Sequence, residues 1–332
     1  MRLLSNAIVL IAFALSAGVE LADPKFDAEL SFGMELTLNQ EFDKADSVSA
    51  AIIKRAPDNP AGYFLRATVR SAKYYDSNDT SQISVIQTMC SKVAELTEKR
   101  NSPEAYLYKG AALAYSSILH AKEDRWLAGA LAGKKSSDVF KKVITDKVKS
   151  SDASGMLGGY YYWTSVFIHR FSWLPFFADR RQEGISLLKK SIPDSRYLKF
   201  ALINSLLWIY YDNFQYDKAL ALCNEVLKKY PDHRIFRQAK MHILFKMNRL
   251  KESSEMAHEL IKDWSGKEIV PINLLNVRIK LAITYYSMGK RTVAAPMATE
   301  LIKYKKDPYI RMRLSKEFGY LEDAVRKNRQ EK

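Results

Sequence analysis

Cysteine, glycine and proline are scarce in this chain of 332 residues, which contains 2 Cys, 13 Gly and 10 Pro. Two cysteines exclude a disulfide framework and any metal centre built from cysteines alone. So few glycines and prolines exclude a collagen-like or linker-rich protein, and a hydrophobic content of 47% excludes a disordered one. Cys90 and Cys223 lie at apolar positions of predicted helices. We therefore predict two buried, unpaired thiols, with one bridge as the alternative.

The sequence also lacks a hydrophobic run long enough to cross a bilayer, which takes ~20 residues. The apolar run at residues 7–15 is shorter, follows a positive start at Met1-Arg2 and precedes small residues at 16–18. This is the layout of a secretory signal peptide. We predict a signal peptide over residues 1–22, with an uncleaved anchor as the alternative. The mature protein is then exported, periplasmic or secreted, and no membrane contact is expected beyond the signal peptide.

Positive charge is unevenly distributed along the chain. The formal net charge is +15, but residues 23–100 carry −2 and residues 101–332 carry +17. Such a surface attracts nucleic acid, anionic lipid, acidic polysaccharide or acidic protein. Export argues against nucleic acid, and the basic residues are spread over many segments rather than clustered. We expect a protein or peptide partner with acidic character, while a lysine-rich solvated surface is the simpler interpretation.

Apolar residues recur at three- and four-residue spacing almost throughout, whereas strand patterns are nearly absent. In residues 216–229, for example, Ala219, Cys223 and Val226 share one helical face. The pattern predicts an all-α chain of roughly 14 to 16 helices joined by short loops. Prolines fall at the predicted helix boundaries, where they open or stop a helix, at Pro57, Pro103, Pro193, Pro231, Pro271 and Pro308.

The predicted helices repeat in pairs. The offsets between Tyr216, Ala219, Cys223 and Pro231 are the same as those between Phe42, Ala45, Ser49 and Pro57. The first helices of the pairs also share a pattern, in which a small residue follows a large one, as in Leu157-Gly158 and Leu281-Ala282. A small residue lets the second helix of a pair approach closely.

These residues resemble the tetratricopeptide repeat (TPR), a helix–turn–helix unit of about 34 residues. The likeness is clearest over 26–59, 200–264 and 275–308, and residues 60–199 are more divergent. The resemblance implies an α-solenoid of antiparallel helix pairs, a TPR-like superhelix, over residues 23–330. It further implies a non-catalytic scaffold that binds a protein or peptide on its concave face, which the first helices line.

Sequence motifs for chemistry are missing. The five histidines include no pair spaced for a helical metal site, and no H-E-x-x-H, G-x-S-x-G, P-loop or G-x-G-x-x-G is present. We therefore expect no enzyme, no metal and no cofactor. An α/α-toroid enzyme stays as an alternative, because its paired carboxylates would be set by the fold. The sequence gives no oligomeric state.

Two groups of residues are candidate binding sites. Residues 158–177 are rich in aromatics and are followed by two arginines, which suggests either a buried central helix or an aromatic pocket with a basic rim. The candidates in this group are Tyr162, Trp163, Trp173, Phe176, Arg180 and Arg181. A second group should lie on the first-helix face or be buried against a neighbouring pair. Its members are Asn204, Trp208, Tyr211, His242 and Phe245.

The aromatic region also supports an alternative function. In size, helical content and aromatic central helices, the chain is similar to periplasmic helical-repeat components of solute transporters. That resemblance implies a carrier or transporter-associated component that binds a small or lipid-like ligand in the 158–177 region. A closed apolar cavity there would favour the carrier, and an open groove lined by polar and aromatic residues would favour the scaffold.

Overall fold

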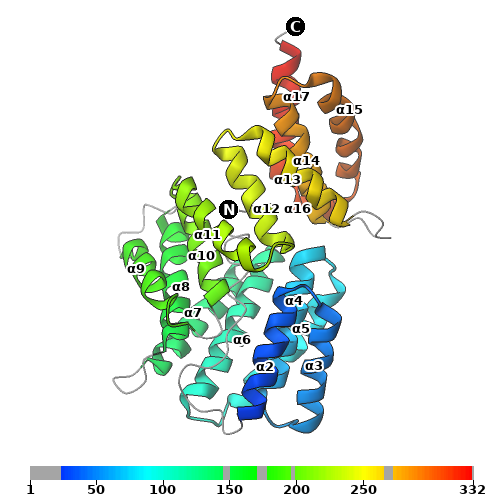
Figure 1. The fold of residues 1–332 in the computed structure, drawn as a ribbon. Coiled ribbons are helices and arrows are strands. Elements are labelled where there is room, and N and C mark those ends of the chain that lie inside the picture. The colour runs from blue at the N-terminus through cyan, green and yellow to red at the C-terminus, as the bar shows by residue number, and fades with distance from the viewer. Residues whose placement is uncertain (1–23, 145–149, 170–177, 196–198, 265–271, 331–332) are drawn as a thin grey trace. The chain divides into compact units, whose positions relative to one another are not determined.

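The computed structural model describes residues 24–144, 150–169, 178–195, 199–264 and 272–330. Within these ranges the chain forms sixteen α-helices and one 3-10 turn, with no strand. The all-α prediction is confirmed. The predicted signal peptide, over residues 1–22, lies outside the described residues. The chain divides into two compact units, Met1–Tyr74 with Thr80–Gln215 and Tyr75–Asp79 with Tyr216–Lys332 (Figure 1).

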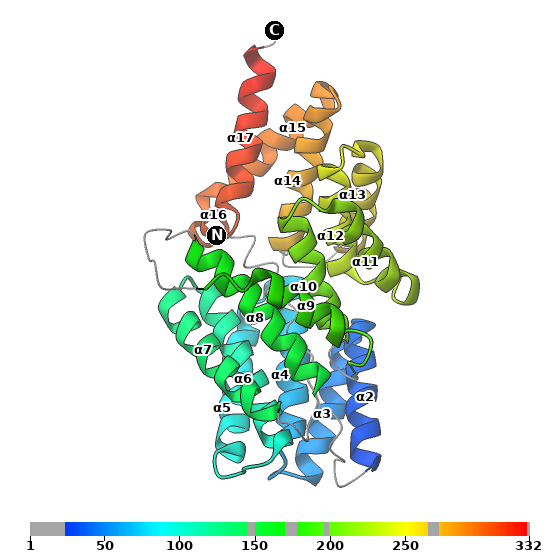
Figure 2. The same ribbon diagram turned by 90° about the vertical axis from the view of Figure 1, so that its left-hand side faces the viewer.

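The first unit holds the helices up to α10, and α4 ends in the short segment counted with the second unit. Its helices are α2 (Pro24–Leu38), α3 (Phe42–Arg55), α4 (Pro60–Ser77), α5 (Ser81–Thr97), α6 (Pro103–Lys122), α7 (Trp126–Val143), α8 (Ser151–His169), α9 (Arg181–Ser191) and α10 (Lys199–Asp212). Consecutive helices pack as pairs, α2 on α3, α6 on α7 and α8 on α9 (Figure 2). The short connections between α2 and α3 and between α6 and α7 make these paired neighbours antiparallel.

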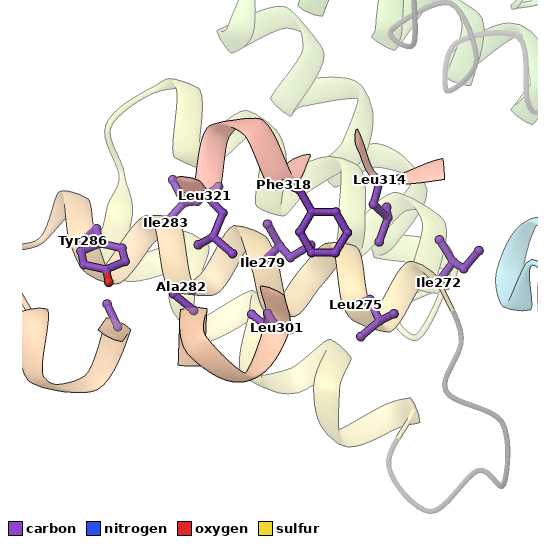
Figure 3. Close-up of a cluster of buried hydrophobic side chains, with 12 residues drawn as sticks. Ile272, Leu275, Ile279, Ala282, Ile283, Tyr286, Leu301, Leu314, Phe318 and Leu321 are labelled. Carbon is purple, nitrogen blue, oxygen red and sulfur yellow. The ribbon is translucent and has the colours of Figure 1, made fainter. Parts of the chain in front are cut away.

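The second unit continues the same arrangement. Its elements are α11 (Tyr216–Lys229), α12 (Arg234–Lys246), α13 (Leu250–Trp264), α14 (Ile272–Ser287), α15 (Arg291–Ile302), the 3-10 turn η1 (Lys303–Lys306), α16 (Pro308–Arg313) and α17 (Ser315–Gln330). Helix α12 pairs with α13 and α14 with α15, while α17 packs on α14. Figure 3 shows Ile279 and Ile283 of α14 beside Phe318 and Leu321 of α17. Consecutive helices of the second unit thus pack as helix–turn–helix units.

Small residues set the distance between α8 and α9, as the sequence predicts. A Cβ atom on Gly158 of α8 would lie 2.6 Å from the carbonyl oxygen of Gly184 in α9. A Cβ atom on Gly184 would lie 2.5 Å from the carbonyl oxygen of Gly158. The two backbones therefore touch where the helices cross, and no larger residue fits at either position.

Five of the described turns between consecutive helices share one backbone device that the sequence does not reveal. Each places a residue with positive φ just after the first helix, and the residues are Gln40, Asp124, Phe214, Asn248 and Gly289. The next N–H then donates to the carbonyl five residues back, as from Arg249 to Leu244 and from Lys290 to Tyr285, both at 2.9 Å. This is the Schellman cap, which satisfies carbonyls at the end of a helix. The sequence points only to Gly289, because the other turns use four different residue types.

Both cysteines are free and buried, which confirms the prediction for Cys90 and Cys223. Burial raises the pKa of the Cys90 thiol to about 12, so this thiol stays protonated at neutral pH. No helix in the described part of the chain is long and apolar enough to cross a membrane.

Candidate functional site

Helices α6, α7 and α8 of the first unit surround a cavity of about 280 Å³. Small residues leave room for it, and they are Ala114, Ala121, Gly129, Ala130, Gly133 and Gly159. Aromatic residues form much of its wall, and they are Trp126, Phe140, Tyr160, Trp163 and Phe167. This is the kind of apolar cavity whose presence would favour a small-molecule ligand.

Glycine and serine pairs hold α6 and α7 together beside the cavity. The Ser117 hydroxyl donates to the carbonyl oxygen of Gly129 at 2.7 Å, and the Ser136 hydroxyl donates to that of Gly110 at 2.7 Å. A Cβ atom on Gly129 would lie 3.0 Å from the Ser117 carbonyl oxygen, so the two helices cross at close range there. The cavity thus forms next to a rigid crossing rather than in a loose region.

Two polar groups of the cavity wall have no hydrogen-bond partner within the described ranges of the chain. The Ser137 hydroxyl and the indole N–H of Trp163 are buried without a hydrogen bond, and the two residues are 1% and 4% exposed. Burial raises the pKa of Tyr160, which also lines the wall. Lys134 lies close to Tyr160, but its ammonium is paired with Asp138 at 2.6 Å.

Of the first-group candidates that the structure describes, Trp163 lines this cavity, whereas Tyr162, Arg180 and Arg181 do not. Trp173 and Phe176 lie outside the described residues. Tyr162 is buried, and its hydroxyl donates to Asp212 at 2.9 Å and accepts from Asn213 at 2.8 Å, which joins α8 to the end of α10. Burial, and then Asp212, raises the pKa of this hydroxyl.

The two arginines of this group form ion pairs with carboxylates two or three residues away in the chain. Arg180 stacks over the ring of Tyr161, 3.3 Å from its centroid, and pairs with Glu183 at 2.5 Å. Arg181 pairs with Asp179 at 2.6 Å. The α6 and α7 side chains of the cavity were missed by sequence reasoning. The sequence feature that could have revealed them is the four-residue spacing of Gly129 and Gly133, which places both glycines on the same face of α7.

The second group of candidates falls in both units. Asn204, Trp208 and Tyr211 lie on α10, at 1%, 6% and 9% exposure. The Trp208 and Tyr211 rings pack edge to face with centroids 5.3 Å apart. Both side-chain atoms of the Asn204 amide, and the indole N–H of Trp208, are buried without a hydrogen-bond partner. The low exposure agrees with burial against neighbouring helices, and the unpartnered Asn204 amide is the feature that still points to a binding role.

His242 and Phe245 lie on α12 of the second unit, beside Lys280 of α14. The Lys280 ammonium sits 4.4 Å from the centroid of the Phe245 ring. Burial, followed by repulsion from Lys246, lowers the pKa of Lys280 to about 8. Burial, followed by Lys280, lowers the pKa of His242 to about 3, so this ring is neutral at pH 7.

A third lysine and one carboxylate complete this region. Lys316 of α17 also repels the Lys280 ammonium, and Glu317 attracts it. We call Lys246, Lys280 and Lys316 the lysine cluster. Among the described residues, two lysines repel the Lys280 ammonium and one carboxylate attracts it. The Nε2 atom of His242 and one oxygen of Glu317 are buried without a hydrogen bond. An incompletely neutralised, half-buried cation of this kind favours an anionic group.

Among the described residues, no group of three or more His, Cys, Asp or Glu side chains is arranged to hold a metal ion.

No model of a known protein family matches the chain, and no curated protein sequence matches it. A solved Rap protein complexed with competence and sporulation factor is similar with a TM-score of 0.53 and 11% identity, over 91% of this chain and 86% of that one. NprR in complex with its cognate peptide NprX is similar with a TM-score of 0.47 and 12% identity, over 89% and 81%. A TPR protein from Parabacteroides merdae gives 0.41 and 10%, over 90% and 99%. The chain thus has the fold of a TPR-like α-solenoid built from antiparallel helix pairs.

Proposed function

We propose that this protein is an exported, non-catalytic scaffold that binds a protein or peptide partner through side chains of the first helices of its pairs. The fold supports this function, because each helix pair of a solenoid adds surface for an extended partner. The Rap protein of the same fold is complexed with competence and sporulation factor, which supports a similar role here by analogy.

The observation that carries the proposal is the lysine cluster. With a pKa of about 8, Lys280 is still mostly charged at pH 7, although it is half-buried and two further lysines repel it. A carboxylate from a partner would offset this repulsion, and the charge-assisted hydrogen bond would be stronger in these surroundings than in water. The Phe245 ring offers an apolar contact directly beside that position. We infer a partner segment in which an acidic residue is next to an apolar one.

Selection of random peptides tests this proposal. Displayed dodecapeptides would be selected on the protein lacking residues 1–22 and counter-selected on a Lys280→Met variant. A Lys251→Met variant is the matched control, because Lys251 is exposed on α13 and its loss changes the net charge equally. We expect Asp or Glu next to an apolar residue in peptides that prefer the wild type over Lys280→Met. Peptides without acidic residues, or equal binding to all three proteins, would count against the lysine cluster.

Export has its own test. The full chain with a C-terminal tag would be expressed in a bacterial host and its N-terminus determined by mass spectrometry. We expect the periplasmic protein to begin between residues 17 and 23 of the printed sequence. An intact Met1 on protein that stays in the cytoplasm would contradict export and leave the binding proposal standing.

A further inference from the structure

We propose that the cavity between α6, α7 and α8 is a second binding site, which takes a small, neutral and largely apolar molecule that carries one hydrogen-bond acceptor. This site lies in the first unit and goes beyond the scaffold function, because the lining residues that the structure describes belong to α6, α7 and α8.

The volume of the cavity sets the size of its ligand. A dry cavity of ~150 Å³ holds benzene. At about 280 Å³, this cavity has nearly twice that volume. It therefore suits a molecule of roughly 10 to 13 non-hydrogen atoms, such as a substituted bicyclic ring.

The lining sets the character of the ligand. Five aromatic side chains and several Ala and Gly residues form the wall, and no Asp, Glu, Lys, Arg or His is among the lining residues described. The nearby Lys134 ammonium is already paired with Asp138. A ligand carboxylate or ammonium would thus lose water without gaining a counter-charge, so a neutral ligand is favoured.

The donor groups of the cavity wall differ in whether they have a hydrogen-bond partner, and this difference supports an acceptor on the ligand. The Ser117 and Ser136 hydroxyls donate to backbone carbonyls of Gly129 and Gly110. The Ser137 hydroxyl and the Trp163 indole N–H, in contrast, have no protein partner although both are buried. Leaving such groups unpaired is unfavourable. A ligand oxygen that accepts from either of them would remove part of this cost.

The cavity has an apolar opening on α7. Ala130 lines the cavity and is itself exposed, so it marks the opening. Leu127 lies one turn before Ala130 on α7 and one turn before Leu131, and the two leucines are 76% and 56% exposed. Exposed leucines beside an apolar cavity suit the entry of an apolar molecule from water.

Two probes that differ in one atom type test the proposal. 2-Acetylnaphthalene is a neutral ketone of suitable size, and 2-isopropenylnaphthalene has the same shape without the acceptor oxygen. Their affinities for the protein lacking residues 1–22 would be measured by the quenching of probe or tryptophan fluorescence. We expect the ketone to bind about 10-fold more tightly than the hydrocarbon, after correction for their partition between water and octanol.

Substitutions with matched controls locate the site. Ser137→Ala and Trp163→Phe should each reduce the preference for the ketone to about 3-fold or less, because each removes one donor. Ser71→Ala and Trp264→Phe should leave the preference unchanged, because these residues also bear buried, unpartnered groups but lie outside the cavity wall. Ala130→Trp should block the opening and abolish the binding of both probes. Thermal melting of each variant confirms that it is folded.

Several results would overturn the proposal. One is a failure of both probes to bind the wild type up to their solubility limits. Another is binding that Ala130→Trp does not change, or a preference for the ketone that survives both Ser137→Ala and Trp163→Phe. Tighter binding of palmitate than of the ketone would assign the cavity to an acyl chain with an anionic end, and would refute a compact neutral ligand.

Discussion

Lys280→Met should make the protein more stable at pH 7 while it weakens the binding of an acidic partner. Methionine has nearly the length of the lysine stem and needs no hydrogen bond, so it fits the half-buried position on α14. Residues retained for binding often reduce stability, and their removal then separates the two properties.

The pKa of Lys280 gives the magnitude of this effect. A fall from 10.5 to about 8 corresponds to at most about 3 kcal/mol of destabilisation by the charged form at pH 7. The variant also loses the contact of the ammonium with the Phe245 ring, which is worth about 1 kcal/mol. We therefore expect a net gain of about 1–2 kcal/mol in the free energy of unfolding.

The pH dependence provides a signature that a change in packing would not give. Because the folded-state pKa lies below the unfolded one, the unfolded protein binds more protons between pH 8 and 10.5. The free energy of unfolding of the wild type should therefore rise through this window, relative to that of Lys280→Met, as the penalty of the buried charge disappears. The difference between the two proteins should shrink to about zero or reverse near pH 10.5.

Urea unfolding at several pH values, followed by circular dichroism, measures this difference. Lys251→Met on the exposed surface of α13 should change stability by less than about 0.5 kcal/mol and show no such window. If Lys280→Met is less stable than the wild type at pH 7, the ammonium stabilises the fold, and the reasoning about an uncompensated charge is refuted.

Three further predictions concern the turns, a buried histidine and the helix crossing. Phe214 has a φ of +59° and is 78% exposed, so Phe214→Gly should raise the free energy of unfolding by about 1 kcal/mol in urea titrations. Gly289 has a φ of +72°, so Gly289→Ala should lower the free energy of unfolding by about 1 kcal/mol. No change in either variant would show that the left-handed turns carry no strain. Burial lowers the pKa of His233 to about 4, so the unfolded chain takes up a proton first as the pH falls below about 6.5. The free energy of unfolding of the wild type should therefore fall by up to about 3 kcal/mol between pH 6.5 and 4, relative to that of His233→Gln. Parallel pH profiles of stability for the two proteins would contradict this. Gly158→Ala should destabilise the protein by about 2–3 kcal/mol, because its Cβ would meet the Gly184 carbonyl. Gly319→Ala on α17 has open space and should be neutral or stabilising by up to about 1 kcal/mol. Equal effects of the two substitutions would argue against the close α8–α9 crossing.

The sequence predicted those parts of the fold that depend on local pattern. Apolar spacing and boundary prolines located the helices, and the small residue at Gly158 predicted the close approach of α8 and α9. Buried thiols followed from the helical faces of Cys90 and Cys223. Each of these features is encoded within one or two neighbouring helices, so spacing along the chain is enough to find it.

Features that depend on three helices were out of reach. The cavity needs facing small residues on α6, α7 and α8, and only its α8 wall stood out in the sequence, through the aromatic run that includes Trp163. The lysine cluster combines α12, α14 and α17, and a single lysine such as Lys280 looks like any exposed one until its neighbours are known. Positive φ at Phe214 has no residue-type signal at all, because a bulky side chain is rare there.

Calorimetric titration of one selected acidic peptide and its Glu→Gln counterpart tests the scaffold function most directly. Each peptide would be titrated into the wild type, Lys280→Met and Lys251→Met at low ionic strength and in about 0.5 M salt. If the partner's carboxylate docks on the lysine cluster, Glu→Gln should weaken binding about 10-fold in the wild type and in Lys251→Met, but less than about 2-fold in Lys280→Met. The same loss in all three proteins, unaffected by salt, would show that the acidic residue binds elsewhere and that the lysine cluster is not the partner site.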